Sequence, residues 1–153
     1  ITPYMKIITN FGGATCLITI TVLLLIIVKN KKIGLLTLTN LVTITILNQI
    51  LKFILRRPRP TEFKIINETG YSFPSGHSMI SMAFYGFLIY LIYKNIKNKC
   101  LKTTLIIILS LLIIAIGISR IYLGVHYVSD VIGGFLISIS YLIVYIKLIK
   151  KKL

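Results

Sequence analysis

The sequence predicts an all-α protein, a polytopic bundle of membrane-spanning helices. Hydrophobic residues make up 56% of the 153 residues, and the mean hydropathy is +0.92. A soluble domain of this length would need a larger polar surface, so these values indicate an integral membrane protein. The apolar residues form continuous runs and do not alternate with polar ones, which favours helices over a β-barrel. At this length the chain, residues 1–153, is expected to form a single domain.

Five apolar runs predict the membrane spans. They cover residues 14–28, 33–55, 76–93, 103–118 and 128–146. Ahead of the first run, residues 2–11 mix apolar and polar side chains in the manner of a short interfacial helix, and a pair of glycines follows. The second run ends in Asn48, Gln49 and Lys52, which are costly in lipid and are therefore expected to face protein or a water-filled site.

The charged residues predict how the bundle is oriented. Residues 29–32, 94–102 and 147–152 are rich in lysine and contain no acid, so the positive-inside rule places them on the cytoplasmic side. The opposite side, with residues 56–75 and 119–130, carries every arginine, both histidines and all three acids. Topology does not require this clustering. It therefore indicates a site on the extracytoplasmic face of the plasma membrane.

The net charge of +15 would suggest a nucleic-acid partner in a soluble protein. Here the lysines lie at the ends of apolar runs and act as topology signals, so no nucleic acid is expected. Cys16 lies in an apolar run and Cys100 in a lysine-rich connection. No disulfide between them is expected, and neither cysteine has the spacing of a metal ligand.

The stretch Ser119–Asp130 carries the residue types of a catalytic site. His126 and Asp130 are spaced i, i+4, so on a helix they share one face and can touch. A carboxylate beside an imidazole fixes the tautomer, which suits a histidine that acts as nucleophile or base. Arg120 can place a guanidinium against a bound anion.

A second stretch, Lys52–Pro60, supplies further positive charge. Lys52 lies at the end of a predicted helix, and Arg59 follows a proline that breaks the helix. The two cations can therefore converge on one anion.

A third stretch, Phe73–His77, predicts the start of a helix. Ser75 is placed to act as N-cap, and Gly76 lets a ligand approach the free backbone N–H groups that bind anions. His77 then lies in the first turn, where it could donate a proton to a leaving group.

Each stretch alone also fits a purely structural role: a histidine–aspartate pair in a loop, a basic cluster at the membrane border, or an ordinary capped helix. Together they form an anion site with two histidines and an aspartate. No metal ligand cluster is predicted, and the arginines favour phosphate. Arginine and lysine would then provide the charge stabilisation that Mg²⁺ provides in other phosphoryl-transfer sites.

The three stretches together resemble the signature of the type-2 phosphatidic acid phosphatase (lipid phosphate phosphatase) superfamily. The matching elements are Lys52-x6-Arg59-Pro60, Pro74-Ser75-Gly76-His77 and Ser119-Arg120-x5-His126-x3-Asp130. Every signature position is matched, in order. Any one motif is weakly to moderately specific, whereas the three together are highly specific.

The resemblance implies a role for each matched residue. His126 would attack phosphorus and form a phosphohistidine, Asp130 would orient His126, and His77 would protonate the leaving oxygen. The phosphate oxygens would be held by side chains and backbone groups of the remaining signature residues, which are Lys52, Arg59, Ser75, Gly76 and Arg120. Members of the family need no metal and no other cofactor.

Membrane members of this family have six spans, with the site on the extracytoplasmic face. Five spans are counted here and the chain begins at Ile1, so the first span is expected to be missing. The short connection between Pro60 and Pro74 resembles small bacterial enzymes similar to phosphatidylglycerophosphatase B and undecaprenyl-diphosphate phosphatases. The expected partners are the bilayer and a lipid phosphate substrate, and the oligomeric state is left open.

The favoured hypothesis is a metal-independent lipid phosphatase acting on undecaprenyl diphosphate at the outer leaflet. Phosphatidylglycerol phosphate and phosphatidic acid are close alternatives, because nothing in the sequence indicates the lipid tail. A phosphotransferase would use the same phosphohistidine but a different acceptor. The superfamily also contains vanadate-dependent haloperoxidases, which the membrane spans disfavour. A non-catalytic protein that binds anionic lipid is the remaining alternative.

Overall fold

The computed structural model describes residues 1–150, and these form six helices joined by turns and loops. The helices are α1 (Thr2–Asn10), α2 (Ala14–Ile27), α3 (Lys31–Leu55), α4 (Gly76–Asn95), α5 (Lys99–Tyr122) and α6 (Val128–Ile149). Lys151 and Lys152, which were predicted to belong to the cytoplasmic tail, lie outside the described residues. The prediction of an all-α membrane bundle is confirmed.

Four of the helices, α3 to α6, are long and apolar enough to cross a membrane. Helices α1 and α2 qualify only as a pair, bent by 42° at the break between them. Residues 1–150 therefore contain four candidate spans, or five if the bent pair counts as one, against the five predicted. The span predicted for residues 14–28 does not qualify on its own, because α2 has only 14 residues. The helix predicted for residues 2–11 is present as α1.

Some helix limits differ from the predicted ones, and α5 shows why. It was predicted to begin at residue 103, but it begins at Lys99. Asn98 acts as N-cap, with its side-chain oxygen accepting a hydrogen bond from the backbone N–H of Leu101 at 3.0 Å. The asparagine cap pairs a backbone N–H group of the first turn that would otherwise have no acceptor. The helix can therefore begin among the lysines that were predicted to lie in a loop.

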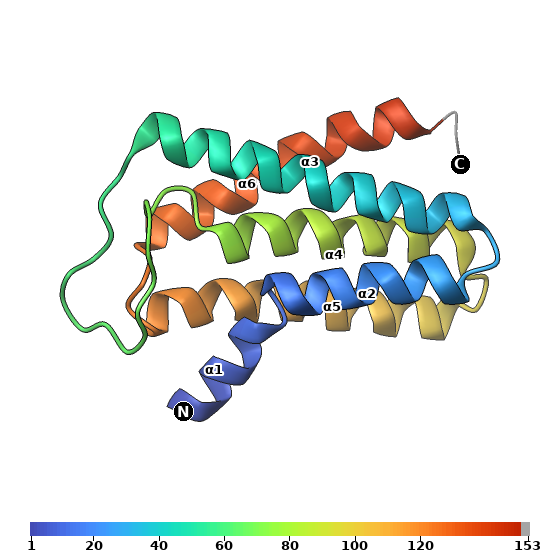
Figure 1. The fold of residues 1–153 in the computed structure, drawn as a ribbon. Coiled ribbons are helices and arrows are strands. Elements are labelled where there is room, and N and C mark those ends of the chain that lie inside the picture. Colours follow the sequence, from blue (N-terminus) through green and yellow to red (C-terminus); the bar gives the residue numbers. More distant parts are fainter. Residues whose placement is uncertain (151–153) are drawn as a thin grey trace.

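Helix α4 lies at the centre of the bundle and packs against α3, α5 and α6 (Figure 1). Its side chains Met79, Ala83, Phe84 and Phe87 are fully buried. Burial of this apolar surface against three neighbours fixes the position of α4. The start of α4, where the third sequence stretch lies, is therefore held on a rigid element.

The break between α1 and α2 packs closely against the start of α4. A side-chain carbon at Gly12 would lie 2.7 Å from the Ile116 side chain and 3.4 Å from the His77 ring. Only glycine allows so close an approach. Tyr85 of α4 also donates a hydrogen bond to the backbone carbonyl of Phe11 at 2.7 Å, which ties the bend to the bundle.

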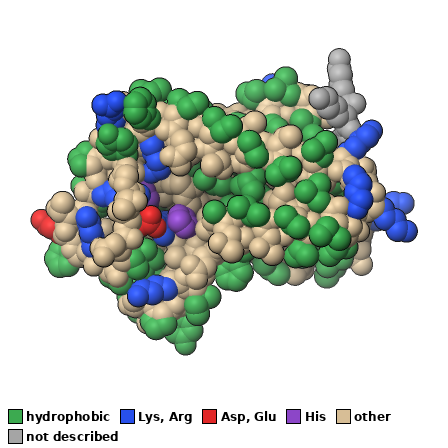
Figure 2. All heavy atoms as spheres, viewed as in Figure 1, with side chains coloured by type: hydrophobic (Ala, Val, Ile, Leu, Met, Phe, Trp, Pro, Cys, Tyr) green, Lys and Arg blue, Asp and Glu red, His purple; other side chains and the backbone are tan. Residues whose placement is uncertain are grey.

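The two ends of the bundle differ in charge. The α2–α3 and α4–α5 connections and the end of α6 lie at one end, at the right in Figure 1. The long connection between α3 and α4 and the α5–α6 turn lie at the other end. Figure 2 shows lysine and arginine at both ends, whereas acidic and histidine side chains appear only at the second end. This separation is the one the sequence predicted.

Candidate active site

Two loops close the second end of the bundle, residues 56–75 and residues 123–127. The backbone N–H of Ile65 donates to the carbonyl of Leu123 at 3.1 Å, which joins the two loops. Gly124 has a φ of +72°, and a side-chain carbon there would lie 2.2 Å from the carbonyl oxygen of Phe63. Glycine is therefore required where the loops touch. The contact brings the residues of the two loops to one place.

His126 and Asp130 meet within this closure, and both are buried. The Nδ1 atom of His126 lies 3.5 Å from Oδ2 of Asp130. The contact expected from their spacing is present, although not along one helix, since His126 precedes the N-cap Tyr127 and only Asp130 lies in α6. The contact arises from the capping turn, in which Asp130 Oδ2 accepts a hydrogen bond from the Tyr127 N–H at 2.9 Å.

Two further side chains hold Asp130, and sequence reasoning missed both. Arg57 donates to Oδ1 at 2.8 Å and places its guanidinium 4.3 Å from the centre of the Tyr127 ring. Ser72 donates to Oδ2 at 2.5 Å, and its Oγ lies 3.3 Å from Nδ1 of His126. Arg57 could have been suspected from its place in the basic stretch. A serine in a loop is too common for the sequence to single out Ser72.

The contacts of His126 define its tautomer. Arg59 Nη1 lies 3.2 Å from Nε2 of His126. A guanidinium can only donate, so Nε2 must be the accepting nitrogen and Nδ1 carries the hydrogen, facing Ser72 and Asp130. The lone pair of Nε2 is therefore on the side of the ring that faces the cationic side chains.

His126 is also neutral at physiological pH. Burial, together with the positive charges of Arg59, Arg120 and Lys52, lowers the pKa of His126 well below its usual value. The imidazole therefore needs no loss of a proton before it can act as a nucleophile.

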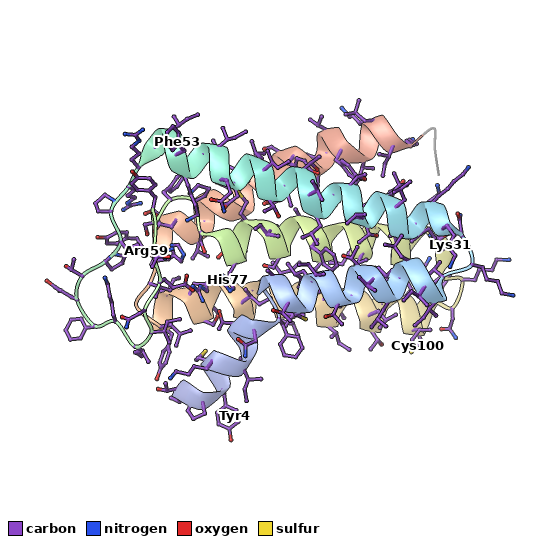
Figure 3. The ribbon with its side chains drawn as sticks, viewed as in Figure 1. Tyr4, Lys31, Phe53, Arg59, His77 and Cys100 are labelled. Atoms are coloured by element: carbon purple, nitrogen blue, oxygen red, sulfur yellow. The ribbon has the colours of Figure 1, made fainter. Side chains whose placement is uncertain are left out.

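His126 lines a cavity of about 670 Å³, as does Arg59, the residue that its Nε2 atom faces. Six of the predicted site residues line its polar end, namely Lys52, Arg59, Gly76, His77, Arg120 and His126. Apolar side chains of α2, α3 and α4 line the rest, among them Leu17, Ile18, Leu41, Phe53 and Ile80. Figure 3 shows Arg59 and His77 at the same end of the bundle, and Figure 2 shows the surface hollowed beside a histidine.

Two of the cations in the cavity, Lys52 and Arg59, donate hydrogen bonds to neutral backbone carbonyl oxygens. Arg59 donates to the backbone carbonyls of Thr69 at 2.9 Å, Gly70 at 3.0 Å and Val125 at 3.0 Å. Lys52 donates to the carbonyl of Tyr71 at 2.5 Å. These carbonyls fix the two side chains without cancelling their charge, so the positive charge remains available to an anion.

Arg120 is held differently, by one hydroxyl and one carboxylate. Its Nη1 donates to Thr9 Oγ1 at 2.8 Å, and its Nη2 donates to Glu68 Oε1 at 2.6 Å. Its Nε has no hydrogen-bond partner within residues 1–150, although the side chain is buried. Thr9 and Glu68 were not predicted, because Thr9 comes from α1 and Glu68 lies in a loop with no motif around it.

Asp130 and Ser75 are the predicted site residues that do not line the cavity. Asp130 lies behind His126. Ser75 is the N-cap of α4, as the sequence predicted, and its Oγ accepts hydrogen bonds from Ser78 Oγ at 3.0 Å and from the Ser78 N–H at 3.5 Å. Within residues 1–150, no three His, Cys, Asp or Glu side chains cluster closely enough to hold a metal ion.

Comparison with known proteins shows the family to which the chain is related. The profile of the PAP2 superfamily matches residues 33–153. Phosphatidylglycerophosphatase B of Bacillus subtilis is 36% identical over 84% of this chain, and the chain covers 65% of the length of that protein. Undecaprenyl-diphosphatase of Sulfolobus acidocaldarius is 30% identical over 94% of this chain, and the chain covers 69% of the length of that protein.

A solved structure shows the same fold. The crystal structure of a transmembrane PAP2-type phosphatidylglycerolphosphate phosphatase from Bacillus subtilis superposes with a TM-score of 0.89. It is 32% identical in sequence, and the match covers 98% of this chain and 77% of that chain. Helices α1 to α6 therefore have counterparts in a known membrane phosphatase.

Proposed function

Because the chain belongs to the PAP2 superfamily, we propose that it is a membrane phosphatase that removes a phosphate group from a lipid mono- or diphosphate through a phosphohistidine. One observation carries the proposal. The neutral His126 lines a cavity that combines cationic and apolar side chains, and the lone pair of its Nε2 faces Arg59, which lines the same cavity. A lipid phosphate combines the same two features.

The reaction would proceed in two displacements. Nε2 of His126 attacks phosphorus while the bond from phosphorus to the lipid oxygen breaks, and His77 gives a proton to that oxygen. His77 then takes a proton from water, and the resulting hydroxide attacks the phosphohistidine and releases inorganic phosphate. Asp130 stabilises the positive charge that develops on the His126 ring and keeps the hydrogen on Nδ1.

The negative charge of the transition state would be met by fixed donors. Lys52, Arg59 and Arg120 line the cavity and supply the charged donors. The backbone N–H groups at the start of α4, beginning at Gly76, supply neutral donors. Ser75 would contribute through its cap, which holds these N–H groups in place. Donors that are held before the substrate arrives need no reorganisation during the reaction.

Two lipids are the leading substrates. The most similar relatives named above act, by their names, on phosphatidylglycerol phosphate or on undecaprenyl diphosphate. The match to a phosphatidylglycerolphosphate phosphatase structure favours the first. The extracytoplasmic site expected from the lysine distribution favours the second, since this carrier lipid is recycled from the outer leaflet.

The proposal is tested by phosphate release from the purified protein in detergent with excess EDTA. The panel holds undecaprenyl diphosphate, phosphatidylglycerol phosphate and phosphatidic acid, each with wild type and His126→Ala. We expect release that resists EDTA and falls to background in the variant, because the nucleophile is lost. The order of rates identifies the preferred lipid. Undiminished release by His126→Ala would refute the mechanism, and phosphate found on an acceptor other than water would indicate a transferase.

A further inference from the structure

Glu68 is the one acid among residues 1–150 that lines the catalytic cavity. Its carboxylate lies at the cationic end. Oε1 accepts the hydrogen bond from Arg120 Nη2 at 2.6 Å, and Oε2 lies 4.0 Å from Arg59 Nη2. In the proposed mechanism, these same two guanidinium groups bind the substrate phosphate.

The carboxylate is charged at neutral pH. Burial alone would raise the pKa of Glu68, but the hydrogen bond from Arg120 and the nearby positive charges outweigh burial and lower it. A charged carboxylate between two guanidinium groups presents oxygens in the arrangement that a phosphate edge presents. In this state of the protein, Glu68 therefore occupies one donor of Arg120 that a bound phosphate would use, and it partly balances the charge of Arg59.

The structure also allows Glu68 to leave. Its side chain is 30% exposed, and the neighbouring residues Asn67 and Thr69 are exposed. In this part of the loop, Arg59 donates hydrogen bonds to the backbone carbonyls of Thr69 and Gly70. Within residues 1–150, the Glu68 side chain accepts a hydrogen bond only from Arg120. A change of side-chain rotamer would move the carboxylate to solvent without breaking the loop.

We propose that Glu68 is a built-in competing anion, which occupies the phosphate position between Arg59 and Arg120 and must be displaced when a phosphate group binds. The inference rests on the proposed function, because it takes the arginines as the phosphate site. Glu68 then sets the affinity of the site. It keeps the two arginines paired while no substrate is bound, and it weakens retention of the inorganic phosphate product.

A simple positioning role predicts the opposite sign. If Glu68 only oriented Arg120, its removal would loosen the guanidinium and weaken phosphate binding. If Glu68 competes, its removal frees donors and tightens phosphate binding, while the protein without phosphate loses a counter-ion and becomes less stable.

The experiment measures binding of inorganic phosphate, which requires no turnover. The melting temperature of the protein in a neutral detergent is followed against phosphate concentration at pH 7.5 and constant ionic strength. We expect Glu68→Gln to melt lower than wild type without phosphate, and to bind phosphate on the order of tenfold more tightly, the gain of about one charge-assisted hydrogen bond.

Two further variants control the result. Glu62→Gln removes the same charge from an exposed position in the same loop and should leave phosphate affinity unchanged. Glu68→Asp keeps the charge but shortens its reach to Arg120, so it should also bind phosphate more tightly than wild type, by less than Glu68→Gln. If Glu68→Gln fails to fold, the phosphate affinity of Glu68→Asp provides the test.

The outcomes separate this inference from the proposed function. Equal or weaker phosphate binding by the Glu68 variants, with clear binding by wild type, overturns the competing role and leaves the phosphatase proposal intact. Absence of phosphate binding in wild type and in all Glu68 variants overturns both. Tighter binding in the Glu68 variants, with wild-type affinity in Glu62→Gln, supports the proposal.

Discussion

Asp130 is bound from several sides, and this arrangement indicates what its carboxylate does. Arg57 binds Oδ1, while Ser72 and the Tyr127 N–H bind Oδ2. Donors on both oxygens fix the carboxylate in place beside the imidazole ring. We therefore infer that Asp130 orients His126 and stabilises the positive charge that develops on its ring.

Ser72 is the residue that links Asp130 to His126, and its removal tests that link. Ser72→Ala takes away the hydroxyl that lies between Oδ2 and Nδ1, so the imidazole loses part of its orientation. We expect kcat to fall by roughly tenfold, which corresponds to about 1.4 kcal/mol and lies within the range for one hydrogen bond. KM should not change, since Ser72 does not line the cavity.

A matched variant is available one residue before Asp130. Ser129→Ala removes a hydroxyl that accepts from Arg57 at 2.7 Å but does not touch His126. Its kcat should stay close to that of wild type. Wild-type kcat in Ser72→Ala, or an equal loss in both variants, would show that the hydroxyl of Ser72 does not position the histidine.

The low pKa of His126 makes stability depend on pH. The unfolded chain protonates this histidine below its usual pKa near 6.5, whereas the folded protein keeps it neutral, so the unfolded state binds more protons. The free energy of unfolding then falls as the pH falls below 6.5, by up to about 1.4 kcal/mol per pH unit from this group. His126→Gln should lack this contribution.

The measurement is the melting temperature of both proteins from pH 7.5 to pH 5.0 without phosphate. All other titrating groups are present in both proteins, so the difference between the two curves reports His126. On acidification, we expect the melting temperature of the wild type to fall further than that of the variant. Parallel curves would mean that folding does not exclude a proton from His126.

The residues of the site divide by whether the sequence could predict them. Lys52, Arg59, His77 and His126 could be predicted, because each belongs to a motif whose spacing reflects its chemistry. The others, which are Thr9, Arg57, Glu68 and Ser72, act through contacts between distant segments. A single sequence does not reveal such contacts, since each partner is a common residue in an ordinary context.

At the scale of elements, α1 has the least expected role. The sequence predicted an interfacial helix, but Thr9 of α1 is buried and holds Arg120 Nη1 at 2.8 Å. Helix α1 also lies outside the residues matched by the family profile. A helix that sequence reasoning placed at the periphery thus holds a residue of the proposed phosphate site, Arg120.

Thr9→Val tests this contribution. Valine keeps the shape of threonine but leaves the Nη1 donor without its acceptor, so we expect the free energy of unfolding to fall by about 1–3 kcal/mol. KM for the lipid phosphate should rise because Arg120 is less well held. The matched control is Thr19→Val, since Thr19 is exposed on α2 and its hydroxyl donates only to the carbonyl of Thr15.

Steady-state kinetics and melting curves of the two threonine variants show whether α1 contributes to the site. If Thr9→Val and Thr19→Val behave alike in KM and stability, α1 serves the membrane surface and not the site. A larger effect of Thr9→Val in both measurements places α1 among the elements that form the cavity.

At the scale of the whole molecule, the sequence predicted the bundle well because the bilayer constrains it strongly. Spans must be apolar and helical, so apolar runs locate α3 to α6 to within a few residues. The loops are not constrained in this way. Their paths depend on contacts such as that between Gly124 and Phe63, and these appear only once the bundle has brought the loops together.

The polarity of the bundle also gives a prediction about its orientation. Among residues 1–150, the end with Cys100 carries lysines and no acid, whereas the opposite end carries the cavity and Glu62. The positive-inside rule then places Cys100 in the cytoplasm and the cavity outside. Because Cys100 and Glu62 are both exposed, thiol labelling can report the side of each.

The test uses intact cells and a maleimide that does not cross membranes. In a Cys16→Ser background, the native Cys100 should be labelled only after the cells are permeabilised. In a Cys16→Ser, Cys100→Ser background, Glu62→Cys should be labelled in intact cells, and the same background without Glu62→Cys should not be labelled at all. The reverse pattern would place the cavity in the cytoplasm, where phosphatidylglycerol phosphate would become the stronger substrate candidate and recycling of an outer-leaflet carrier lipid would no longer fit.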